Sequence, residues 1–148
     1  MGQSLCQILT HLVYSTKNRR ACLAPALRPE LFAVLGHILK THGSDPIQIG
    51  GHVDHVHLFF NLGKQNAICD LVRDIKTDSC HWMKKQGVHD FEWQSGYAAF
   101  SISIMDKPRV IQYILNQDEH HKKQDFKAEL LEMLQRAQMP YDEKYLWD

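Results

Sequence analysis

The spacing of apolar and polar positions divides the chain into eight segments of predicted regular structure. Short runs rich in β-branched and aromatic residues predict strands at residues 7–15, 46–49, 53–62 and 97–104. Apolar residues that recur every three or four positions predict helices at residues 25–41, 66–86, 106–121 and 125–138. Asn66 is expected to cap the second helix, and Pro140 to begin an irregular tail.

The order of these segments predicts a fold class. The first six follow the ferredoxin-like split βαβ plan, an α+β fold in which an antiparallel sheet carries two helices on one face. The last two helices would follow this unit. A length of 148 residues predicts one domain, residues 1–148. The apolar first strand fits either an edge strand that pairs with another chain or a central strand.

Two histidines stand two residues apart in the third predicted strand. Because side chains alternate along a strand, His55 and His57 point to the same face and Val56 to the other. Alone, such a pair is more often an ordinary polar feature of an exposed face. A histidine triad of nucleotide hydrolases is excluded because Phe59 occupies the third position. The zinc-hydrolase pattern His-x-His-x-Asp-His is excluded because Asp54 precedes the pair.

A tyrosine and a glutamine stand four residues apart in the third predicted helix. Tyr113 and Gln117 would share one helix face. Two imidazoles and an amide oxygen can hold a divalent metal, and the helix would then tie the tyrosine to the metal site. Each half of this arrangement is weak alone, since a helical tyrosine usually packs and a glutamine usually faces solvent. His120 and His121 follow closely and could supply a competing ligand.

Together with their flanking segments, these motifs resemble a known family. The His-hydrophobic-His, or HUH, motif lies within residues 54–58, and similar segments occur at 14–20, 93–101, 113–121 and 126–134, in the family's order. The chain resembles the single-tyrosine HUH transposases of IS200-like insertion sequences over nearly its whole length.

This resemblance implies a mechanism. His55, His57 and Gln117 would bind Mg²⁺ or Mn²⁺, and Tyr113 would attack a DNA phosphate so that a 3′-hydroxyl leaves and a 5′-phosphotyrosine forms. Because the covalent bond conserves the phosphodiester energy, a 3′-hydroxyl can reverse the step and join another strand. The mechanism needs no ATP, and the sequence has no GxxxxGK[ST] phosphate loop.

The resemblance also implies partners. The substrate would be single-stranded DNA that folds into a hairpin, bound by a homodimer whose subunits share their active sites. The candidate DNA contacts are basic residues after the first strand and on the second helix: Lys17, Arg19, Arg20, Arg73 and Lys76. The formal net charge of zero departs from the usual basic DNA-binding protein and predicts modest, salt-sensitive affinity.

The remaining composition limits the location of the protein and leaves two rival functions. The chain has no run of about 18 apolar residues and no signal-peptide pattern, so we expect a cytoplasmic protein that does not enter the membrane. Its four cysteines lack CxxC spacing and are expected to be reduced thiols. The rivals are a DNA-hairpin-binding protein without catalytic activity and an HUH nickase of replication or plasmid transfer.

Overall fold

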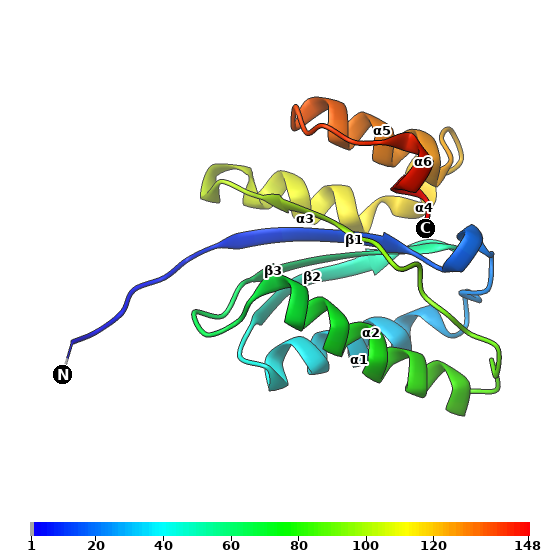
Figure 1. Cartoon of the computed structure of the whole chain (residues 1–148), viewed down its shortest axis with the longest axis horizontal. Helices are drawn as coiled ribbons and strands as arrows, with labels where there is room; N and C mark the ends of the chain where they lie inside the picture. Colours follow the sequence, from blue (N-terminus) through cyan, green and yellow to red (C-terminus); the bar gives the residue numbers. More distant parts are fainter. Residues whose placement is uncertain (1) are drawn as a thin grey trace.

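The computed structural model describes residues 2–148 and contains a four-stranded antiparallel sheet with helices on both faces (Figure 1). The strands lie in the order β2-β3-β1-β4, and each neighbouring pair is antiparallel. Their bounds are β1 (Leu9–Ser15), β2 (Asp45–Gly51), β3 (His55–Asn61) and β4 (Ala98–Ser101). This confirms the predicted α+β class and the split βαβ order.

Strand β1 lies in the centre of the sheet, between β3 and β4. All seven of its residues are buried. Leu12 and Tyr14 belong to the core on one face, while Val13 packs on the other. Both faces of β1 are therefore covered, which explains why apolar residues such as Leu12 and Val13 occur on both of its faces. Of the two alternatives that the sequence left open, the structure has the central strand.

The helices form one layer on each face of the sheet (Figure 1). The layer of α1 (Arg28–Thr41) and α2 (Ile68–Lys85) packs on Leu12, Val56 and Leu58. On the other face lie α3 (Lys107–Leu115), α4 (Gln117–His120) and α5 (Phe126–Arg136). Their apolar residues contact Val13 and Phe59. Three short helices complete the chain: η1 (Lys17–Arg19), η2 (Ile104–Asp106) and α6 (Glu143–Leu146).

Several element boundaries differ from the sequence prediction. The helix expected at 106–121 is interrupted at Asn116, whose φ of −95° and ψ of 21° are not helical. Asn66 does not cap α2, which begins after Ala67; its side chain instead lies 2.5 Å from the Ser44 hydroxyl. The tail expected to be irregular contains the single turn α6.

Gly50 allows α3 to lie directly against the sheet. A Cβ atom at this position would stand 2.7 Å from Ile114 Cγ2 and 2.9 Å from the Ile114 carbonyl oxygen. Gly50 pairs with His57 in the β2–β3 ladder, so α3 crosses the sheet beside the histidine pair. The absence of a side chain at residue 50 therefore sets the distance between that pair and the tyrosine helix.

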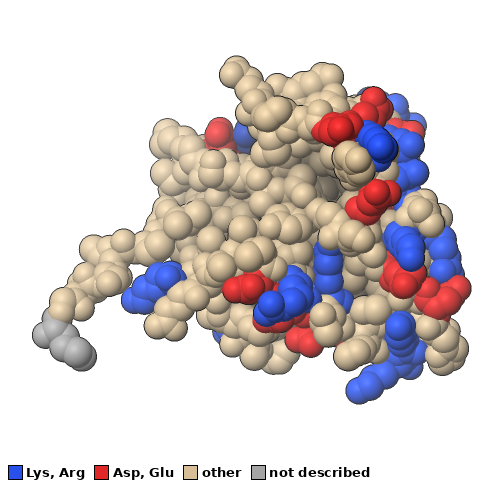
Figure 2. Space-filling view, in the orientation of Figure 1, with Lys and Arg blue, Asp and Glu red and all other residues tan. Residues whose placement is uncertain are grey.

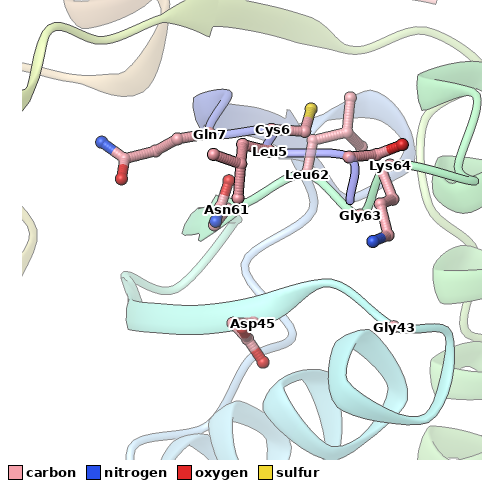
Figure 3. A pocket seen from close by; sticks show the side chains of 10 residues that line it. Leu5, Cys6, Gln7, Gly43, Asp45, Asn61, Leu62, Gly63 and Lys64 are labelled. Carbon is pink, nitrogen blue, oxygen red and sulfur yellow. The ribbon is translucent and has the colours of Figure 1, made fainter. Parts of the chain in front are cut away.

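The opposite end of the sheet carries a separate cavity of about 520 Å³. An extended N-terminal segment, residues 4–7, forms one wall, and the turns around Gly43 and Gly63 form the other (Figures 1 and 3).

All four cysteines are free thiols, as predicted. Among residues 2–148, we find no helix that is both long enough and apolar enough to cross a membrane.

Candidate metal and tyrosine site

Strand β3 presents both histidines of the HUH motif to the layer of α3, α4 and α5. His55 and His57 are fully buried, with 0% of their surface exposed, and Val56 faces the opposite core. Fully buried imidazoles are not solvated surface residues. The exposed-face interpretation of the pair is therefore excluded by its position under the C-terminal helices.

The two other predicted site residues lie next to this pair. Gln117, at the start of α4, places its Oε1 atom 2.9 Å from His55 Nε2. Its Nε2 atom lies 3.4 Å from the Tyr113 carbonyl oxygen, so the interruption at Asn116 does not separate the two residues. Tyr113 is half-buried, with its ring 5.6 Å from that of His57. The fold thus brings all four residues together within one chain.

The centre of the site is occupied by Glu129, an acidic residue of α5 that is 1% exposed. Its Oε1 atom lies 3.1 Å from His57 Nε2 and 3.2 Å from His55 Nε2. Its Oε2 atom accepts hydrogen bonds from the Tyr113 hydroxyl and, at 3.2 Å, from Gln117 Nε2. One carboxylate therefore contacts every residue that the sequence placed in the site.

Burial and these contacts shift the pKa values of the site. Burial opposes ionisation of Glu129, but hydrogen bonds from His121, His55 and His57 outweigh it and lower its pKa. Burial also opposes protonation of His55, yet its bonds to Asp54 and Glu129 raise its pKa to about 9. For Tyr113, burial and the nearby charge of Glu129 both raise the pKa, so the phenol is protonated.

Two further side chains orient the histidines from behind. His55 Nδ1 donates to Asp54 Oδ1 at 2.7 Å, and His57 Nδ1 shares a hydrogen bond of 2.8 Å with His11 Nε2. Both contacts turn the Nε2 atoms toward Glu129. Partners on the far nitrogen are a regular feature of metal-binding histidines, because they fix the ring orientation.

The histidines that follow Gln117 also lie next to Glu129. His121 Nε2 is 2.9 Å from Gln117 Oε1 and 3.3 Å from Glu129 Oε2. His120 Nε2 is 3.1 Å from Glu129 Oε2 but lacks the alignment of a hydrogen bond. The ring of His52 stacks on His121, with centroids 5.0 Å apart. Both predicted competitors therefore reach the centre, and His121 lies within reach of the predicted ligand atoms.

Helix α4 is also attached to the opposite layer by Asp118. Its carboxylate accepts a hydrogen bond of 2.9 Å from His52 and one of 3.2 Å from Arg28 at the start of α1. The hydrogen bond from His52, opposed by slight burial and aided by the Arg28 charge, lowers the pKa of Asp118. These contacts hold the residue next to Gln117 in place.

The residues present fit a small divalent cation. His55, His57 and Gln117 offer two nitrogen atoms and one oxygen atom, and His55, His121 and Glu129 form a second group whose ligand atoms lie within 4.8 Å of one another. Mixed nitrogen and oxygen donors suit Mg²⁺ or Mn²⁺ better than the sulfur-rich sets of structural zinc sites. The chemistry of the donors is therefore compatible with the predicted metals.

A cavity of about 440 Å³ leads from the surface to Tyr113 and Glu129. It opens between α3 and α5, with apolar walls from Phe100, Val110 and Met133 and two arginines, Arg109 and Arg136. The larger cavity beside residues 4–7 contains none of the predicted catalytic residues. The smaller cavity is thus the one that bears on the chemistry.

Most of the predicted DNA contacts are paired with acidic side chains or backbone carbonyls. Lys17 and Arg20 each pair with an acid, Glu92 and Asp90, at 3.0 Å, while Arg19 lies over the Trp147 ring. Arg73 pairs with Asp70 and Asp74 on α2. Lys76 donates to the carbonyls of Gln94 and Gly96, and burial lowers its pKa to about 8. Figure 2 shows the same mixing, with basic and acidic side chains interspersed at the end where the C-terminus lies.

Sequence reasoning missed Glu129, Asp54 and His11. A signal for Glu129 exists: it lies within the apolar face of α5, between Phe126 and Leu130, where a charged residue is unusual. Asp54 and His11 give no comparable signal, because their roles depend on the pairing of β1 with β3 and on the turn before β3.

Comparisons with known proteins identify the family of this chain. Residues 4–117 match the family described as "Transposase IS200 like". The chain is 26% identical over 120 residues to the ISDra2 transposase TnpA of Deinococcus radiodurans, covering 76% of this chain and 86% of that protein.

Two solved structures have a similar fold. A structure assigned to a transposase of Deinococcus radiodurans R1 is 25% identical, with a TM-score of 0.64, and the match covers 79% of this chain and 96% of that one. A REP-associated tyrosine transposase bound to a REP hairpin is 16% identical, with a TM-score of 0.61, over 82% of this chain and 72% of that one. The family match spans most of the sequence and includes all four residues predicted for the site, so this chain belongs to the IS200-like transposase family.

Proposed function

We propose that this transposase cleaves and rejoins single-stranded DNA at the ends of an insertion sequence through a 5′-phosphotyrosine intermediate. The observation that carries the proposal is the convergence of Tyr113, His55, His57 and Gln117 on one buried centre. His55, His57 and Gln117 would hold Mg²⁺ or Mn²⁺, which supplies Lewis-acid stabilisation of charge on the phosphate when bound.

Tyr113 is the proposed nucleophile. Its oxygen forms a bond to phosphorus, the bond from phosphorus to the 3′-oxygen breaks, and the 3′-oxygen takes up a proton. The Tyr113 hydroxyl donates a hydrogen bond to Glu129 Oε2, and this oxygen would accept its proton during attack. In the reverse direction, a DNA 3′-hydroxyl displaces Tyr113 and joins a new strand. The cavity between α3 and α5 gives the DNA phosphate access to this oxygen.

We also propose hairpin-forming single-stranded DNA as the substrate and a homodimer as the assembly. Family membership supports both, and one protein of similar fold is a tyrosine transposase bound to a hairpin. Arg19 is the sequence-predicted contact whose guanidinium is paired with an aromatic ring rather than with a carboxylate. Lys17, Arg20 and Arg73 would have to exchange acidic partners for phosphates, which fits the modest, salt-sensitive affinity expected from zero net charge.

The covalent intermediate provides the test. The protein is incubated with end-labelled, hairpin-bearing single-stranded DNA and Mn²⁺, and the mixture is denatured and separated by electrophoresis. We expect a labelled protein–DNA adduct with the wild-type chain, and a loss of at least about 10³-fold with Tyr113→Phe or with chelator. Tyr145→Phe, at an exposed tyrosine of α6, is the matched control and should leave the adduct unchanged.

The outcomes separate the proposal from its rivals. An unchanged adduct in Tyr113→Phe would reject the nucleophile assignment. Hairpin binding without any adduct would favour the catalytically silent hairpin-binding protein. Cleavage without rejoining to a supplied 3′-hydroxyl end would favour the nickase.

A further inference from the structure

We propose that Glu129 is a fourth protein ligand of the metal ion, supplied by α5, and that its second oxygen holds the Tyr113 hydroxyl beside that ion. The inference rests on the proposed function only in taking this site to bind a divalent metal. Glu129 is not part of the ligand set predicted from the HUH motif and the tyrosine helix. It follows from the position of its two carboxylate oxygens.

The spacing of the donor atoms supports this assignment. Ligands at about 2.1 Å in octahedral geometry stand about 3 Å from their neighbours. His55 Nε2 lies 2.9 Å from Gln117 Oε1 and 3.2 Å from Glu129 Oε1. Glu129 Oε1 lies 3.1 Å from His57 Nε2. These separations match adjacent positions around one ion, so Glu129 Oε1 belongs to the same set as the predicted ligands.

The charge balance also requires an anion at this position. His55, His57 and Gln117 would all be neutral as metal ligands, and each is at most 2% exposed. A dication among neutral, buried ligands would leave its charge uncompensated, which is costly away from water. Glu129 brings one negative charge to the centre. Asp54 adds a second at the far nitrogen of His55.

The second group of candidate ligands leads to the same residue. His55, His121 and Glu129 place their ligand atoms within 4.8 Å of one another. His55 and Glu129 therefore belong both to this group and to the proposed ligand set of two histidines, Gln117 and Glu129. Whichever further nitrogen or amide oxygen joins them, Glu129 remains a ligand.

The two oxygens of Glu129 face different partners. Oε1 faces His55 and His57, while Oε2 accepts hydrogen bonds from Tyr113 and Gln117. Helix α5 is held in this position by Phe126, whose ring stacks on His55 with centroids 4.4 Å apart, and by its Asp125 cap. One residue thus links metal binding to the position of the nucleophile.

Mn²⁺ binding in the absence of DNA tests the proposal. Calorimetry at one fixed pH compares the wild-type chain, Glu129→Gln and Glu132→Gln, which lies one turn along the same helix and pairs with Arg136. We expect Glu129→Gln to weaken Mn²⁺ binding at least about tenfold. Glu132→Gln should bind within about twofold of the wild type. Thermal unfolding in chelator establishes that each variant is folded.

An Mn²⁺ affinity that is unchanged in folded Glu129→Gln would overturn the proposal and leave Glu129 as a partner of the histidines alone. If Glu129→Gln does not fold, Glu129→Asp replaces it, because it keeps the charge but withdraws the carboxylate by one methylene. Weaker Mn²⁺ binding by Glu129→Asp supports the proposal, and wild-type affinity rejects it.

The same experiment separates this inference from the proposed function. Tyr113→Phe should retain Mn²⁺ affinity while losing the DNA adduct, because the phenol is not in the ligand set. Glu129-dependent Mn²⁺ binding by a wild-type chain that forms no adduct would reject the proposed function but not the ligand. If the wild-type chain forms the adduct and Glu129→Gln leaves the Mn²⁺ affinity unchanged, the proposed function stands and the ligand assignment is rejected.

Discussion

Glu129 and His55 carry opposite charges in the metal-free protein and stabilise each other's charged form. The two ring nitrogens of His55 face carboxylate oxygens of Asp54 and Glu129. The doubly protonated ring is therefore favoured despite burial. His57 has one carboxylate contact and a neighbouring histidine, and burial lowers its pKa instead. The pair that defines the HUH motif is therefore unequal: in the absence of metal, His55 is charged and His57 is neutral.

These pKa shifts predict a pH window for stability without metal. Glu129 has a folded pKa below its ordinary 4.5, so its contribution is present above pH 4.5 and is lost as the pH falls. His55 has a folded pKa of about 9 against an ordinary 6.5, so its contribution is full below pH 6.5 and is lost as the pH rises to 9. In chelator, Glu129→Gln should therefore destabilise the protein most between pH 4.5 and 6.5, by about 1–3 kcal/mol.

Urea unfolding at several pH values measures this difference. The gap between wild type and Glu129→Gln should narrow both below pH 4.5 and above about pH 9. Glu132→Gln, which replaces a half-buried acid on the same helix, provides the control and should show no such window. A gap that stays constant across this range would contradict the opposite charges assigned to Glu129 and His55.

Spacing along the chain determined which site residues could be predicted from the sequence alone. His55, His57, Tyr113 and Gln117 were predicted because their spacing along a strand and a helix, together with the flanking segments, resembles the HUH transposases. Glu129 was not, because it is 12 residues from Gln117 and reaches the histidines only when α5 folds back over β3. Its single sequence signal, a charge on an apolar helix face, indicates burial but not the partner.

At the scale of elements, the distance between α3 and the sheet controls the site. Helix α3 crosses β2 at Gly50, where Ile114 occupies the space that a side chain would need. The sequence predicted that this strand would end at residue 49, but Gly50 and Gly51 both lie within β2 and pair with β3. Close helix packing, not backbone flexibility, accounts for Gly50.

Gly50→Ala should therefore displace the tyrosine helix. The new methyl group would meet the Ile114 backbone at 2.9 Å, so α3 must move or β2 must bend. We expect a loss of about 1–3 kcal/mol in stability and a larger fractional loss of DNA adduct, because Tyr113 and Gln117 move with α3. Urea unfolding and the adduct assay measure the two effects.

Gly36→Ala is the matched control for this substitution. Gly36 lies in α1 on the opposite face, and its Cβ would meet the end of the Ile49 side chain at 3.3 Å and Pro46 at an ordinary contact distance of 3.9 Å. Alanine is also favoured over glycine within a helix by about 1 kcal/mol. Gly36→Ala should leave adduct formation intact; equal losses in the two variants would show that α3 packing at Gly50 has no special effect on the site.

The sequence predicted the existence and order of the elements more accurately than their boundaries. All four strands and the four long helices occur in the predicted order, because burial on one or both faces leaves a clear periodic pattern. The break at Asn116 leaves no such pattern. It is stabilised by tertiary contacts of α4, including those of Asp118 with Arg28 and His52, which are distant in the sequence.

At the scale of the whole molecule, one chain supplies every residue of the site. Helices α3, α4 and α5 cover one face of the sheet that contains β3, and Glu129 of α5 contacts residues of β3, α3 and α4. Sharing of active sites between subunits would require α3 and α4 to leave Gly50, His52 and Arg28 of their own chain. The contacts described here therefore favour a site that is complete within each chain of the proposed homodimer.

Mixed dimers distinguish these two assemblies. Tyr113→Phe and His55→Ala chains carrying different tags are co-expressed and purified through both tags, and light scattering establishes the mass of the product. If each chain completes its own site, every site in the mixed dimer lacks either the nucleophile or a ligand. The DNA adduct should then stay at the level of the separate variants. Exchange of the tyrosine helix would instead pair an intact His55 with an intact Tyr113 in one of the two sites, restoring up to about half of the wild-type adduct. Such recovery would show that α3 moves between subunits, and that the packing of Ile114 on Gly50 forms between chains in the active dimer.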